Sequence, residues 1–73
     1  DLEVSDGNRY WVLEFKWAGK GRRAENLLEE ALRQLKNRRY GDEVPPDAEL
    51  HRIALVFSEE ARKFVLWQEV PAA

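Results

Sequence analysis

The hydrophobic period of this chain changes twice along its length, and this limits the folds that it can adopt. Apolar and polar residues alternate over residues 9–17, as in a β-strand. Over residues 22–39 the apolar positions follow the i, i+3, i+4, i+7 spacing of an amphipathic helix. Residues 53–57 are continuously apolar, which is typical of a strand covered on both faces. A strand, a helix and a second strand in this order predict a right-handed crossover between two parallel strands.

Two further strands complete the expected architecture. Residues 2–4 alternate ahead of Asp6-Gly7, which is followed by Asn8, and this is a hairpin-turn signal. Residues 41–51 contain Gly41 and Pro45-Pro46 and are expected to form a loop. After a turn at residues 58–61, residues 63–67 are predicted to pair antiparallel with residues 53–57. The chain of 73 residues is therefore expected to be a single α/β domain: β-hairpin, one long helix, parallel crossover strand and final antiparallel strand.

The alternation in residues 9–17 places two sets of side chains on opposite faces of the strand. One set is Trp11, Leu13, Phe15 and Trp17, and the other is Tyr10, Val12, Glu14 and Lys16. Since aromatic side chains contribute much of the buried area of small proteins, Trp11, Phe15 and Trp17 are predicted to belong to the core. His51 has no evident ligand partner in the sequence and is predicted to be a surface residue.

Composition excludes several classes of protein. The chain has no cysteine, so it can form neither a disulfide nor a thiolate metal site, which is compatible with a cytoplasmic location. No apolar run approaches the roughly 18 residues of a membrane span, so no membrane partner is expected. The net charge of −2 argues against nucleic-acid binding, but residues 16–40 carry eight Lys or Arg against three Glu, a local charge of +5. Such a segment can contact phosphates, or it can simply be a solvated helix face.

Glu14 and Lys16 are two residues apart on a predicted strand, so their side chains leave the same face. They are either a solvated ion pair at a sheet edge or part of a site. The hairpin can add Asp1, which lies opposite Val12 if the loop has two residues, Asp6-Gly7, and opposite Glu14 if it has four. Both registers put Asp1 on the face of Glu14 and Lys16. A loop of three residues without a bulge does not.

The pattern of Asp1 followed thirteen positions later by Glu14-Phe15-Lys16 resembles the D…ExK motif of the PD-(D/E)XK nuclease superfamily. The similarity continues along nearly the whole chain. Its further elements are residues 31–36, which include Gln34, then Tyr40, residues 53–58, Arg62 and Trp67. They look like the bacterial group of that superfamily that is often found at the C-terminus of AAA-ATPase-like proteins.

This resemblance implies a restriction-endonuclease-like core that hydrolyses phosphodiester bonds of nucleic acid, with DNA favoured over RNA. It implies that Asp1 and Glu14, with the carbonyl oxygen of Phe15, hold Mg²⁺ or Mn²⁺, since these hard cations prefer oxygen ligands. Lys16 is expected to orient the attacking water or to neutralise the charge that develops on the phosphate. Gln34 is expected to reach the same site from the helix.

The chain departs from the superfamily pattern at its start, because the helix and strand that precede the motif Asp are missing. The chain is therefore expected to be the C-terminal portion of a nuclease domain from a larger protein, and to be inactive as a fragment. Two other functions stay open. The chain could be a non-catalytic interaction module of a larger ATPase-type protein, or a small α/β domain that self-associates through exposed strand edges.

Overall fold

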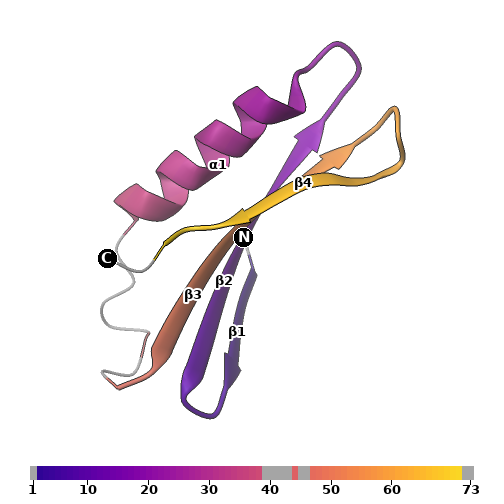
Figure 1. Cartoon of the computed structure of the whole chain (residues 1–73). Helices are drawn as coiled ribbons and strands as arrows, with labels where there is room; N and C mark the ends of the chain where they lie inside the picture. The colour runs from indigo at the N-terminus through magenta and orange to yellow at the C-terminus, as the bar shows by residue number, and fades with distance from the viewer. Residues whose placement is uncertain (1, 39–43, 45–46, 72–73) are drawn as a thin grey trace.

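A computed structural model of the chain describes residues 2–38, 44 and 47–71, and shows a four-stranded sheet with one helix across one face (Figure 1). In chain order the elements are β1 (Leu2–Asp6), β2 (Arg9–Ala18), α1 (Ala24–Asn37), β3 (Glu49–Ser58) and β4 (Lys63–Glu69). The strand order in the sheet is β1-β2-β3-β4. The expected α/β fold is therefore confirmed. Among the described residues, no helix has the length and apolar character that a membrane span requires.

Strand pairing follows the predicted pattern. β2 and β3 are parallel, with Glu14 beside Ala54 and Lys16 beside Val56. β3 and β4 are antiparallel, and the register shifts between Val56 and Phe57. The boundaries differ from those expected: β3 begins at Glu49, inside the predicted loop, and α1 begins later, because Arg23 has an extended backbone.

The hairpin between β1 and β2 turns at Gly7-Asn8, so the alternative with a two-residue loop at Asp6-Gly7 is wrong. Asp6 pairs with Arg9 and Ser5 with Tyr10, which is the register that the four-residue loop gave. Gly7 has a φ of 58°, a left-handed conformation that glycine adopts without steric cost. A glycine with positive φ at the first loop position is typical of a type II′ turn, whose twist suits a two-residue hairpin.

The hydrophobic core lies between α1 and one face of the sheet, here called the helix face. Leu27, Ala31 and Leu35 form the buried stripe of α1. They pack on buried residues of the sheet, which are Val12, Ala18, Ala54, Val56 and Val70, the last just after β4. Small side chains at Ala31 and Ala54, both fully buried, let the helix backbone approach the sheet closely. The side chain of Arg52 donates a hydrogen bond to the carbonyl oxygen of Leu35 near the end of the helix.

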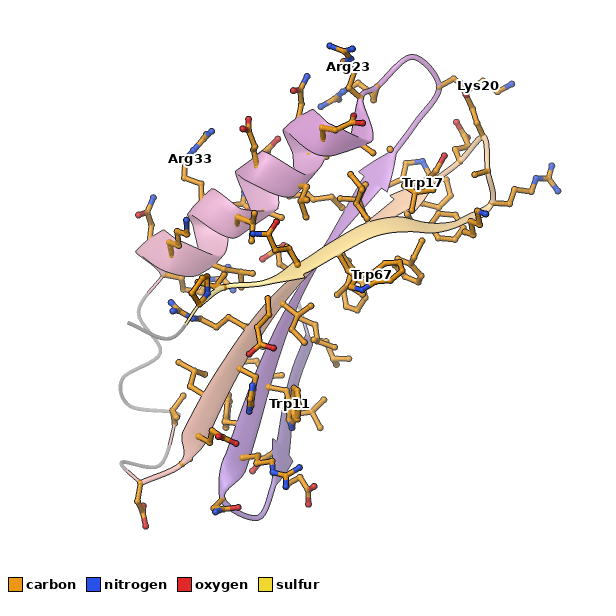
Figure 2. The ribbon with its side chains drawn as sticks, in the orientation of Figure 1. Trp11, Trp17, Lys20, Arg23, Arg33 and Trp67 are labelled. Atoms are coloured by element: carbon orange, nitrogen blue, oxygen red, sulfur yellow. The ribbon has the colours of Figure 1, made fainter. Side chains whose placement is uncertain are left out.

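The opposite side of the sheet, here called the aromatic face, is open. It carries six of the seven exposed large apolar side chains in the described part of the chain, which are Leu2, Val4, Phe15, Trp17, Phe64 and Trp67. Trp17 is 60% exposed and Trp67 is 66% exposed. Figure 2 shows Trp67 projecting from β4 on the side of the sheet that is turned away from α1.

The prediction that Trp11, Phe15 and Trp17 form the core is therefore wrong. They lie on the aromatic face, where Trp17 stacks on Phe57 with ring centroids 5.0 Å apart. The expectation that residues 53–57 are covered on both faces is also wrong for the described chain, because α1 covers only the helix face. The bulky rings could not admit the close approach that the alanines of the helix face allow.

His51 is partly exposed, in keeping with the predicted surface position, but its ring has polar partners that the sequence did not indicate. Its Nδ1 lies 2.8 Å from a carboxylate oxygen of Glu69, and its Nε2 lies 3.0 Å from one of Glu49. Its ring stacks on Trp11 at a centroid distance of 4.3 Å. These contacts join β2, β3 and the end of β4 on the aromatic face. Hydrogen bonds to Glu69 first and to Glu49 second raise the pKa of His51 above its ordinary value of 6.5.

Replacing one core residue and one residue of the aromatic face tests which face is buried. We expect Leu35→Ala to lower the free energy of unfolding by about 2–5 kcal/mol, because it leaves a cavity beneath α1. Trp67→Ala removes a larger but mostly exposed side chain and should cost less than about 1 kcal/mol. Urea denaturation followed by circular dichroism measures both values. A larger loss for Trp67→Ala would contradict the assignment.

The contacts of His51 predict a pH dependence of stability. Because the folded-state pKa is raised, the stabilisation is complete below about pH 6.5, the unfolded value. It is lost as pH rises through the higher folded pKa. Urea denaturation between pH 5.5 and pH 8.5 should show stability falling in the native chain and a weaker fall in His51→Gln. Parallel curves for the two proteins would show that His51 does not contribute.

Candidate active site

A groove of about 990 Å³ opens between α1 and β2 on the helix face. Strand β2 supplies Glu14 and Lys16 to one wall, and α1 supplies the other wall. The lining residues are Glu14, Lys16, Asn26, Glu29, Glu30, Arg33, Gln34, Asn37 and Arg38. Every one of them is polar or charged, in contrast to the apolar core beside the groove.

Glu14 and Lys16 lie on the helix face between the buried residues Val12 and Ala18 of the same strand. This confirms that the two side chains share a face. Each is partly exposed, because the strand leaves the apolar core here and meets the groove. The Lys16 side chain is only 19% exposed, so most of its aliphatic stem is packed and its ammonium group reaches the groove.

Helix α1 presents a polar ridge to this groove. Asn26, Glu30 and Gln34 follow one another at intervals of four residues, so they lie one above the other on the helix surface. Gln34 thus lines the same groove as Glu14 and Lys16. No hydrogen bond of the Gln34 side chain to another described residue is present, which leaves its amide able to meet a ligand.

The ridge also contains Glu30, which the sequence reasoning did not single out. Its carboxylate lies 3.5 Å from the ammonium nitrogen of Lys16, and its side chain is 46% exposed. The signal that could have found it is the four-residue spacing before Gln34. The ion pair between Lys16 and Glu30 therefore connects the two walls of the groove.

The oxygen donors of the groove belong to the type that divalent cations prefer. Oxygen ligands suit Mg²⁺ and Mn²⁺, and the described chain provides the Glu14 carboxylate from β2 and the Glu30 carboxylate from α1. The described residues contain no group of three acidic or histidine side chains that could hold a metal ion. Asp1, the other predicted carboxylate ligand, lies outside the described residues, as does Tyr40. The described residues could therefore supply only some of the ligands that a divalent cation needs.

The backbone near Phe15 is open to such a site. Pairing between β1 and β2 ends with Leu2 opposite Leu13, so no described strand covers that edge of β2 beyond Leu13. The Phe15 side chain points to the aromatic face, and only its backbone carbonyl could serve as a ligand. His51 belongs to the aromatic face, and its two carboxylate partners bind opposite ring nitrogens, so these three do not converge on a cation.

The charges of the groove cancel. Three Glu and three Lys or Arg residues line it, for a formal sum of zero. Further basic residues lie along the helix and the loop before it, and Figure 2 shows Lys20, Arg23 and Arg33 spread over this part of the molecule. The described basic residues of this segment are thus spread over β2, the loop before α1, the helix and its C-terminal end, and do not form a single cluster.

Comparison with protein families gives one match. The model of the PD-(D/E)XK nuclease superfamily matches residues 1–67, which is nearly the whole chain and includes every residue assigned above to the strand wall. Searches of curated proteins and of solved structures gave no match.

Proposed function

Since the chain belongs to the PD-(D/E)XK nuclease superfamily, we propose that its groove is part of a metal-dependent site that hydrolyses phosphodiester bonds of nucleic acid. The observation that carries this proposal is that Glu14, Lys16 and Gln34 line one groove. These residues come from two elements and are the ones that the resemblance assigned to the reaction.

The proposed ligands of Mg²⁺ or Mn²⁺ are the carboxylates of Asp1 and Glu14 and the carbonyl oxygen of Phe15. When bound, such a cation polarises the phosphate and lowers the pKa of a coordinated water. Lys16 orients that water or stabilises the negative charge that grows on the phosphate oxygens. Gln34 binds from the helix wall and helps to position the substrate.

Nucleic acid, with DNA favoured, is the proposed partner. Because the lining charges cancel, the groove by itself offers little net attraction to a polyanion. A bound divalent cation makes the groove positive, and Arg33 at its rim can then contact a phosphate. Binding of nucleic acid is therefore expected to depend on the metal and to weaken with salt.

Isothermal titration calorimetry with Mn²⁺ tests the metal site directly and does not require turnover. We expect binding to the native chain and a loss of affinity of at least about tenfold in Glu14→Gln, which keeps the side-chain shape but removes the charge. Glu29→Gln is the matched control, because Glu29 lines the same groove from α1 and should leave the affinity unchanged. No binding to the native chain, or equal losses in both variants, would refute the proposal.

A second candidate function is self-association, which the exposed β1 edge and the aromatic face favour. All five residues of β1 are exposed, and an uncovered edge strand can pair with another chain. Light scattering should then show the mass rising with concentration, and Val4→Lys should restore the monomer by placing a charge on the edge strand. A constant monomer mass in the native chain would exclude this function.

A further inference from the structure

The carboxylates of Glu14 and Glu30 line the same groove as Lys16, and Lys16 forms an ion pair with only one of them. Glu14 leaves the same face of the same strand two residues earlier, and Glu30 faces it across the groove. Among the described residues, the ammonium group of Lys16 makes its ion pair with Glu30, at 3.5 Å, and none with Glu14. The ammonium group of Lys16 is therefore paired across the groove and not along its own strand.

This pairing matters for a carboxylate that is to bind a cation. If the Lys16 ammonium lay against Glu14, a metal ion would have to displace it and would meet its positive charge at short range. With Lys16 drawn toward α1, the oxygens of Glu14 stay available to a hard cation. The ammonium group stays in the groove, where it can still act on a phosphate.

We infer that Glu30 is a positioning residue, which holds Lys16 toward α1 and so keeps Glu14 free to bind the metal. This inference deepens the proposed function and rests on it. The packing of α1 supports it, since Ala31, the next residue, is fully buried against the sheet and fixes the helix backbone at this point. Glu29, one residue before Glu30, also lines the groove, but no ion pair or hydrogen bond joins its side chain to another described residue.

Titration of Mn²⁺ into variants tests this inference. Exposed or partly exposed ion pairs are weak, so a cation that must break a new Lys16–Glu14 pair should bind up to about fivefold more weakly. We expect Glu30→Gln to lose about two- to fivefold in Mn²⁺ affinity, and Glu29→Gln to lose none. Adding Lys16→Met to Glu30→Gln should restore the native affinity, because the competing ammonium group is gone.

The restoring variant separates the possible roles of Glu30. If the loss persists in the double variant, Glu30 is itself a metal ligand, and the inference fails. If Glu30→Gln binds Mn²⁺ as the native chain does, Glu30 does not position Lys16. Should Lys16→Met fail to fold, Lys16→Gln removes the same charge and takes its place in the comparison.

A second measurement does not depend on the metal. In double-mutant cycles followed by urea denaturation at low salt, the charges of Lys16 and Glu30 should be coupled by about two- to fivefold in the unfolding equilibrium constant. The charges of Lys16 and Glu14 should show no coupling in the native background. In the Glu30→Gln background they should be coupled about as strongly as Lys16 and Glu30 are in the native chain. Coupling between Lys16 and Glu14 in the native background would overturn the inference. If the native chain bound no Mn²⁺, the proposed function would fail, and these cycles would still decide what Glu30 does.

Discussion

The contact between α1 and the parallel pair β2–β3 is the constraint on which the rest of the molecule depends. Leu27, Ala31 and Leu35 must face the sheet, and this fixes the rotation of the helix about its own axis. Once that rotation is set, the neighbouring ridge that carries Glu30 and Gln34 can point only toward β2. The polar groove is therefore a consequence of apolar packing, because the same helix turn that buries Ala31 presents Glu30 to Lys16.

Much of the fold could be predicted because hydrophobic period reports secondary structure directly. The order of elements, the parallel pair and the final antiparallel strand all follow from it. The hydrophobic period does not predict which of the two faces of a strand a helix will cover. Aromatic rings suggested one face, but Ala18 and Ala54 mark the other, since a helix packs closely only over small side chains. The choice between faces is thus a question of shape more than of hydrophobicity.

The arrangement of the candidate site was predictable where it depends on one element and less so where it depends on two. Glu14 and Lys16 share a face because strand geometry requires it, and Gln34 followed from the family resemblance. The four-residue spacing before Gln34 places Glu30 on the same ridge, but its pairing with Lys16 depends on how α1 sits over β2, which no local pattern states. His51 is a stronger case, because its partner Glu69 is 18 residues away and comes close only through the β3–β4 register, in which Ile53 lies opposite Glu69.

The two faces of the sheet differ in what they can do with a charged group. On the open aromatic face, water would screen an ion pair and weaken its effect on a ligand. On the helix face, the Lys16 side chain is only 19% exposed, and interactions of such partly desolvated groups are stronger than those in open water. A lysine that must hold one orientation beside the carboxylate proposed to bind a metal is better placed on the helix face. The helix that completes the core therefore also supplies the surroundings in which Lys16 can discriminate between Glu14 and Glu30.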